Sequence, residues 1–302
     1  MSRPTRDSAA GRAYLDLQNR ARAEKRGTQE LLTLYAVERW LARLSASPYA
    51  DQFILKGGML LAAFGARRPT ADADTLVRNL ANDEVTVVAS VIDIANQPMG
   101  HDDGIVFLVD TVRSRVIRDE ELYSGVRVTM DCAVATAKIK LRLDINFGDP
   151  VTPAPGLVDI PALRDGDLAI RVLGYPIETV LAEKVATAIA LGAANTRVRD
   201  FADVFTLTGL HSVTHAGARK ALTATGAYRN VVLVPLSGAI GNLVELRART
   251  YAAYRAGLGR DGTHLPSDFD VVVRAVASFA DRLVEQADAP LRWNPRAREW
   301  EW

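Results

Sequence analysis

The sequence predicts an α+β protein, with a mixed β-sheet flanked by helices followed by a helical C-terminal domain. Two observations predict this class. Segments that read as strands are confined to the first 175 residues, and from Ile177 onward apolar residues recur at helical spacing. The change of pattern divides the chain into a core, residues 1–175, and a helical domain, residues 176–302. A length of 302 residues permits two domains of ordinary size.

The predicted elements of the core begin with a helix from Gln29 to Leu44, for which Thr28 is a suitable N-cap. The segment from Lys138 to Phe147 is the clearest strand, because charged or polar residues alternate with apolar ones along it. One face of this strand is therefore polar. Further predicted strands cover 53–55, 72–77, 105–109, 126–132 and 168–172, and further helices cover 59–64, 85–95, 178–191, 201–206, 242–254 and 269–286.

Bulk composition is that of an ordinary globular chain, with 48% hydrophobic and 24% charged residues. The net charge of +1 gives no overall attraction to nucleic acid, so any basic surface must be local. Cys132 is the one cysteine, which excludes an internal disulfide and fits a reducing compartment. With no apolar signal segment and no long apolar run, we expect a cytoplasmic protein without a membrane span.

The residues that point to chemistry lie between 56 and 74. Gly57-Gly58 leaves a strand and enters a helix, a turn in which backbone N–H groups can approach phosphate oxygens. Asp72 and Asp74 follow, and on a strand their spacing puts both carboxylates on one face. A third carboxylate, Asp144, lies on the polar face of the clearest strand.

Such a set suits a metal site. Mg²⁺ (or Mn²⁺) prefers a few carboxylates, waters and substrate phosphates, so Asp72, Asp74 and Asp144 are the candidate metal ligands. An Asp-x-Asp pair alone is as readily a solvated loop pair. The ordered set of Gly-Gly, Asp-x-Asp and a strand-borne aspartate favours the metal site.

These residues resemble the nucleotidyltransferase superfamily, whose members include polymerase beta and the CCA-adding enzymes. The fuller pattern is similar to the AbiEii-type toxin nucleotidyltransferases of bacterial toxin–antitoxin systems. The resemblance implies a nucleotidyltransferase-like fold, and it covers nearly the whole chain at intervals. The stretches that carry it are 53–76, 122–153, 175–207 and, more loosely, 292–300.

The resemblance also implies roles for individual residues. Asp72, Asp74, Lys184 and Asp200 would be catalytic, with Lys184 and Asp200 closing over the nucleotide, and Asp203 is a weaker candidate. Without the resemblance, Lys184 reads equally well as a surface lysine, and Asp200 as a helix-face partner of nearby arginines. Thr70 stands where the family often has serine, so a hydroxyl is kept. The implied nucleotide-binding residues are Lys56, Gly57, Gly58, Arg68 and Thr70.

The implied reaction is transfer of a nucleoside monophosphate from an NTP to RNA, at the tRNA 3′ end, in a cleft between the two domains. It would block translation, and a cognate antitoxin would be the protein partner. Three alternatives remain open: a protein or small-molecule acceptor, phosphoryl transfer without nucleotidyl transfer, and a non-catalytic binding module. The last predicts that Asp72→Ala leaves the cellular effect intact.

Other motifs carry less weight. Residues 257–262 fit G-x-G-x-x-G but follow a helix, so the dinucleotide-binding context is missing. His211 and His215 are spaced as zinc ligands, yet their surroundings predict a loop. A basic run in the helical half is by default a solvated face, and together with the basic N-terminus it is the predicted place for RNA phosphate contacts. The run comprises Arg247, Arg249, Arg255 and Arg260.

Overall fold

The structure is a computed structural model that describes residues 3–70, 72–119, 123–285 and 290–302. The chain divides into two compact units. The first comprises Met1–Ala63, Arg67–Gly148 and Gly156–Gly174, and the second comprises Phe64–Ala66, Asp149–Pro155 and Tyr175–Trp302. No helix in the described ranges is long and apolar enough to cross a membrane.

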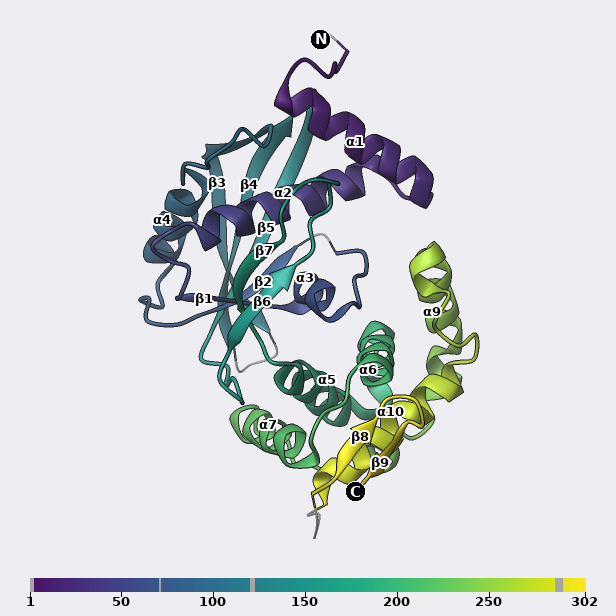
Figure 1. Ribbon diagram of the computed structural model, residues 1–302. Helices are drawn as coiled ribbons and strands as arrows, with labels where there is room; N and C mark the ends of the chain where they lie inside the picture. The colour runs from purple at the N-terminus through teal and green to yellow at the C-terminus, as the bar shows by residue number, and fades with distance from the viewer. Residues whose placement is uncertain (1–2, 71, 120–122, 286–289) are drawn as a thin grey trace. The chain divides into compact units, whose positions relative to one another are not determined.

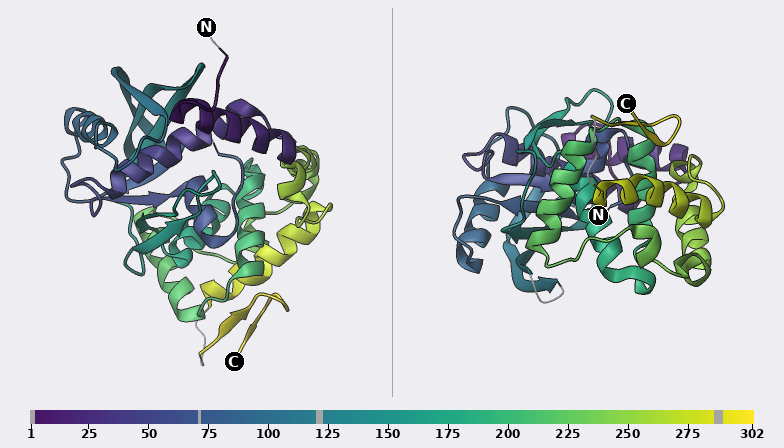
Figure 2. Two further views of the ribbon diagram at one scale, coloured as in Figure 1. Left: turned by 45° about the horizontal axis from the view of Figure 1, so that its top comes forward. Right: turned by 90° about the horizontal axis from the view of Figure 1, so that it is seen from below.

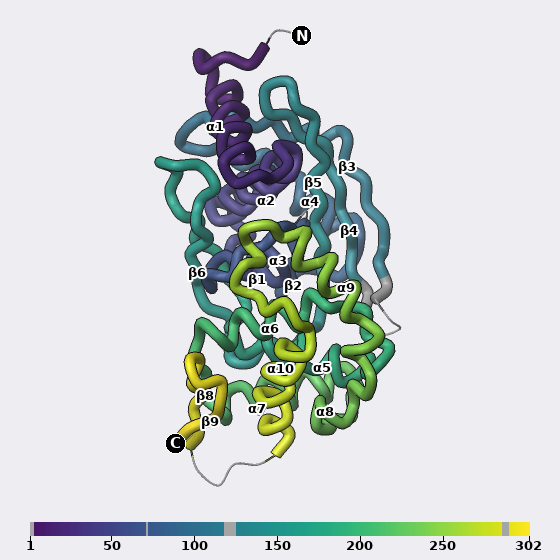
Figure 3. The backbone as a smooth tube through the Cα atoms, turned by 90° about the vertical axis from the view of Figure 1, so that its right-hand side faces the viewer, coloured from purple at the N-terminus to yellow at the C-terminus, as the bar shows by residue number. Residues whose placement is uncertain are grey.

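In the part of the chain that the structure describes, a mixed sheet in the order β3-β4-β5-β2-β1-β7-β6 organises the first unit. The pairs β2–β5 and β1–β7 are parallel, and the other neighbours are antiparallel. The long strands β3, β4 and β5 run beside one another (Figure 3). The strands are β1 (Phe53–Lys56), β2 (Ala73–Val77), β3 (Ile105–Asp119), β4 (Tyr123–Val134), β5 (Ala137–Phe147), β6 (Gly156–Ile160) and β7 (Ile170–Gly174).

Helices cover the apolar face of this sheet. Helix α2 packs on β5 and β7, and α4 packs on β3 and β4 (Figure 1). The predicted alternation of Lys138–Phe147 is confirmed, because Ile139, Leu141, Leu143 and Ile145 are buried. The helices are α1 (Ala9–Glu24), α2 (Thr28–Ser45), α3 (Gly57–Leu60) and α4 (Glu84–Ala95), with a 3₁₀ turn η1 (Leu61–Phe64) after α3.

The second unit is mainly helical, as the periodicity predicts. Helices α5 and α7 lie side by side, and a hairpin of β8 and β9 packs on α10 (Figure 2). The elements are α5 (Ile177–Leu191), α6 (Val198–Leu210), α7 (His215–Tyr228), α8 (Leu236–Ala239), α9 (Leu243–Gly257), α10 (Phe269–Val284), β8 (Arg292–Asn294) and β9 (Glu299–Glu301), with 3₁₀ turns η2 (Gly192–Ala194) and η3 (Gly259–Gly262).

The structure differs from the predicted elements in several places. Strand β3 continues to Asp119, well beyond 109, because it pairs with β4 over most of its length despite its charged residues. Strand β6, helices α7 and α8 and the β8–β9 hairpin are additional elements. Asp72 lies just before β2 rather than in it. The predicted end of the last helix at Gln286 falls outside the described residues.

Candidate active site

Side chains of opposite charge form one row across four neighbouring strands. Lys56 of β1 is the register partner of Asp74 on β2, and Asp74 is the partner of Asp144 on β5. Asp144 is in turn the partner of Arg127 on β4. Register partners lie on the same face of a sheet, with neighbouring strands about 4.8 Å apart. The fold therefore brings Lys56, Asp74 and Asp144 together, as a site of this kind requires.

The two glycines lie directly against this row. Gly57 has a φ of +67°, and a Cβ added to it would meet the side chain of Asp74. A Cβ added to Gly58 would come within 2.7 Å of Thr70 Oγ1 and 3.3 Å of Arg68 Nη1. The turn after β1 can approach the side chains of Asp74 and Thr70 because Gly57 and Gly58 lack side chains.

Thr70 fixes the carboxylate that precedes β2. Its Oγ1 donates to Asp72 Oδ1 at 3.0 Å, and both residues are half-buried. Thr70 therefore contacts Asp72 directly and lies beside Gly58. Four of the predicted nucleotide-binding residues therefore lie in the turn or beside it: Gly57, Gly58, Arg68 and Thr70. The fifth, Lys56, precedes the turn and lies on the row.

Asp144 has a partner that the sequence did not predict. The guanidinium of Arg127 donates to both of its carboxylate oxygens, from Nε at 2.6 Å and from Nη2 at 2.5 Å. The hydrogen bond to Asp144 raises the pKa of Arg127, with smaller electrostatic contributions from Asp72 and Asp74. Arg127 thus pairs with Asp144 and also interacts electrostatically with Asp72 and Asp74.

The three carboxylates do not form a ready-made cage. Among the described residues, no three histidine, cysteine, aspartate or glutamate side chains gather closely enough to hold a metal ion. Asp144 is committed to Arg127 in a fork-to-fork ion pair, a geometry that is strong and specific. A metal-ligand role for Asp144 stays a prediction.

The alternation of polar and apolar residues along β4 could have identified Arg127 as a residue of the polar face. Arg127, Thr129 and Asp131 alternate with the buried Val126, Val128 and Met130 along β4. This places Arg127 on a polar face. Its pairing with Asp144 depends on the register between two strands, which alternation does not determine.

A second charged cluster lies within the helical unit. Lys184 on α5 donates to Asp200 Oδ1 at 2.7 Å and to Asp203 Oδ2 at 2.8 Å, both on α6. Arg197 Nε donates to the other oxygen of Asp200 at 2.6 Å. Burial would raise the pKa of Asp200, but Lys184 and Arg197 outweigh it and hold this pKa well below its usual range. Asp200 and Asp203 are buried in this cluster. Arg197 is exposed and forms with Asp200 the kind of i,i+3 helix-face pair that the sequence also allows.

Two of the weaker motifs have structural roles. His215 is buried and its Nε2 lies 2.8 Å from the carbonyl of Arg282, while His211 Nε2 lies 2.7 Å from the carbonyl of Phe64. Each ring is therefore engaged with backbone. Residues 257–262 end helix α9 and form the turn η3.

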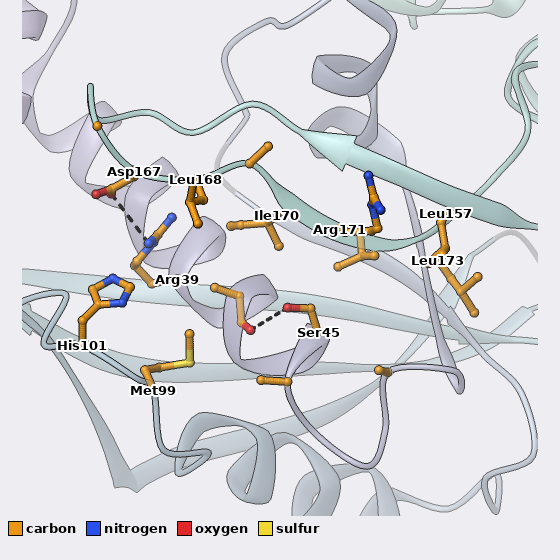
Figure 4. Close-up of a pocket in the computed structure, with 16 residues that line it drawn as sticks. Arg39, Ser45, Met99, His101, Leu157, Asp167, Leu168, Ile170, Arg171 and Leu173 are labelled. Atoms are coloured by element: carbon orange, nitrogen blue, oxygen red, sulfur yellow. Dashed lines mark hydrogen bonds and ion pairs between the residues drawn. The ribbon is translucent and has the colours of Figure 1, made fainter.

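A separate cavity of about 850 Å³ lies in the first unit, between α2 and the β6–β7 hairpin. Apolar side chains such as Leu157, Leu168 and Ile170 line it, and Arg39 pairs with Asp167 at one end (Figure 4). Its described lining includes none of the predicted site residues.

Comparison with known proteins agrees with the geometry. The family described as nucleotidyl transferase AbiEii toxin, of the type IV toxin–antitoxin system, matches residues 39–295. The match spans most of the chain, so this protein belongs to the AbiEii family and is a nucleotidyltransferase. No curated protein sequence matches the chain.

The chain is also similar to solved structures. MenT4, a nucleotidyltransferase toxin from Mycobacterium tuberculosis, is 15% identical with a TM-score of 0.55, over 92% of this chain and 90% of that chain. JHP933 from Helicobacter pylori is 14% identical with a TM-score of 0.43, over 84% of this chain and 94% of that chain. The likeness to MenT4 confirms the predicted α+β, nucleotidyltransferase-like fold.

Proposed function

We propose that this protein transfers a nucleoside monophosphate from an NTP to an RNA acceptor, the 3′ end of tRNA, and thereby blocks translation in the cytoplasm. The observation that carries the proposal is the packing of Gly57 and Gly58 against Asp74 and Thr70. A side-chain-free turn beside carboxylates suits a triphosphate, because phosphate oxygens can accept from backbone N–H groups next to a bound cation.

Each residue of the cluster has a part in this proposal. The turn at Gly57 and Gly58 supplies backbone donors, and Lys56 and Arg68 supply positive charge to the phosphates. Thr70 orients Asp72 through its hydrogen bond of 3.0 Å. Positioning of the reacting groups is the main contribution that a protein makes to phosphoryl chemistry.

Asp72 and Asp74 are the residues that would hold Mg²⁺ or Mn²⁺. Two carboxylates suffice, because Mg²⁺ keeps several waters and takes further ligands from substrate phosphates. When bound, such an ion activates the attacking hydroxyl and stabilises charge on the transferring phosphoryl group. Asp144, held by Arg127, would contribute negative charge from the neighbouring strand whether or not it becomes a ligand.

Lys184 is proposed to bind the nucleotide from the helical unit, with Asp200 and Asp203 positioning its ammonium group. The two carboxylates hold the ammonium at 2.7 and 2.8 Å, which restricts the long side chain to one orientation.

The antitoxin implied by the type IV family would be the protein partner. We propose that it opposes the toxin in the cell, where uncontrolled modification of tRNA would halt protein synthesis. Co-expression of the neighbouring gene with the wild-type chain should restore growth, and the same test with Asp72→Asn should show no growth defect to restore.

The experiment supplies purified protein with Mg²⁺, total bacterial tRNA and each of the four NTPs, labelled either at the α- or at the γ-phosphate. Label from the α-position on tRNA, lost in Asp72→Asn and Asp74→Asn, would establish the reaction and identify the base. Asp131→Asn is the matched control, because Asp131 is a carboxylate on β4 of the same sheet and is paired with Lys140 at 2.7 Å.

Other outcomes would contradict the proposal in defined ways. Label from the γ-position would indicate phosphoryl transfer, and α-label on protein would indicate a polypeptide acceptor. Absence of label on any macromolecule, with an NTP consumed, would indicate a small-molecule acceptor. Cellular toxicity that survives Asp72→Asn would indicate a binding module.

A further inference from the structure

The polar face of the sheet carries exposed cations beyond the carboxylate row. Arg115 on β3 is the register partner of Arg127, so it continues the row of Asp74 and Asp144 onto the next strand. The adjacent row on the same face contains Arg113 and Arg142, with Thr129 between them. The side chains of Arg113, Arg115 and Arg142 are exposed.

Acidic neighbours do not cancel this charge. On β4 and β5, Asp131 is paired with Lys140 and Asp144 with Arg127. Within the described ranges, no ion pair involves Arg113, Arg115, Lys138 or Arg142. The chain as a whole carries a net charge of only +1, so any attraction of nucleic acid to these exposed basic side chains would be local. We call Arg113, Arg115, Lys138 and Arg142 the basic sheet face.

We propose that the basic sheet face binds the phosphodiester backbone of the RNA acceptor next to its reacting end. The inference rests on the proposed function and specifies where the acceptor lies. Side chains two residues apart on a strand are separated by about 6.7 Å, and strands by about 4.8 Å, so the face presents a regular array of cations leading away from the carboxylates. Such contacts position a nucleic acid without reading its sequence.

The helical half offers a weaker rival surface. Arg247 Nε donates to the carbonyl of Asn195 at 2.8 Å, and Arg255 Nε donates to the carbonyl of Leu265 at 2.8 Å. Two of the four arginines of the basic run are thus engaged in holding loops. Arg249 and Arg260 remain exposed and serve as a comparison.

The test measures binding of fluorescent tRNA to the full chain, without NTP, over a range of salt concentrations. The sheet variant carries Arg113→Gln, Arg115→Gln and Arg142→Gln. The matched control, Lys220→Gln, Arg249→Gln and Arg260→Gln, removes the same charge from exposed positions of the second unit. Each lost phosphate contact lowers the slope of log K against log salt by about 0.7 to 0.9. We expect the sheet variant to lose about 2 units of slope and on the order of a hundredfold in affinity at 0.1 M salt.

Three further measurements complete the test. Replacing the same three arginines by lysine should restore the slope, because the charge returns. The affinity for NTP should be unchanged in the sheet variant, since its residues lie outside the phosphate cluster. The apparent KM for tRNA should rise while kcat is retained.

The outcomes separate this inference from the proposed function. If wild-type protein labels tRNA but the sheet variant binds it as tightly as wild type, the basic sheet face is not the acceptor surface and the proposed function stands. If the control variant alone loses affinity, the acceptor lies on the second unit and the inference is wrong. If wild-type protein transfers no label but binds RNA, and the sheet variant alone loses slope, the proposed function fails while the binding surface is retained.

Discussion

Gly57→Ala should disable the enzyme by moving Asp74, and Gly65→Ala is its matched control. Both glycines have positive φ, +67° and +69°, so alanine costs about 1–2 kcal/mol of backbone strain at either position. The surroundings differ. Nothing lies within 4 Å of a Cβ added at Gly65, whereas at Gly57 it would lie 2.6 Å from Asp74 Cγ and 2.8 Å from Asp74 Cβ.

The size of the effect follows from these distances. Ordinary contact begins at 3.4 Å, so the Cγ of Asp74 or the turn must shift by about 0.8 Å, and Oδ2 of Asp74, the nearest atom, must move further. A misplacement of about 1 Å in a reacting group costs on the order of a hundredfold in rate. We therefore expect kcat/KM for label transfer to fall about a hundredfold in Gly57→Ala and to stay near wild type in Gly65→Ala.

The assay is single-turnover transfer of α-labelled nucleotide, with urea unfolding of both variants as the measure of stability. Both should lose about 1–2 kcal/mol from the shared backbone strain. If Gly57→Ala is folded and transfers label as fast as Gly65→Ala, the reasoning is refuted, because Asp74 would then not need its place against the turn.

Three further predictions test other parts of the molecule. Asp200→Asn should lower the free energy of unfolding by about 3 kcal/mol at pH 7, because it removes one partner of a buried ion pair with Lys184. The pKa of Asp200 in the folded state lies below its unfolded value of about 3.9. The difference in unfolding free energy between wild type and variant is therefore complete above about pH 4 and disappears as the pH falls further. A constant difference down to pH 2 in urea titrations would contradict this prediction. Burial raises the pKa of Cys132 to about 12, so a thiol reagent at pH 8 should react with it only at the rate of unfolding, and fast labelling of native protein would count against the buried position. EDTA should abolish label transfer and Mg²⁺ should restore it, with unchanged circular dichroism as the control; transfer that persists in EDTA would exclude Asp72 and Asp74 as metal ligands.

Local patterns determine much of this protein. Alternation along 138–147 identifies a strand with one polar face, and the structure confirms it in β5. The Gly57-Gly58 turn is predictable because residues without a Cβ allow a close approach where a strand passes into a helix. The Asp-x-Asp pair gains its meaning only from its order with this turn and with a strand-borne aspartate. The change to helical periodicity after Ile177 likewise predicts the helical unit, because the position of apolar residues along a helix depends on neighbours three and four residues away.

Tertiary structure alone decides which charges meet. The row of Lys56, Asp74, Asp144 and Arg127 depends on the register of four strands, two of which, β2 and β5, are distant in sequence and pair in parallel. Alternation fixes the face of each side chain but not its partner, because shifting a strand by two residues keeps the face and changes every neighbour. The ion pair between Arg127 and Asp144 is a product of that register and could not be read from the sequence.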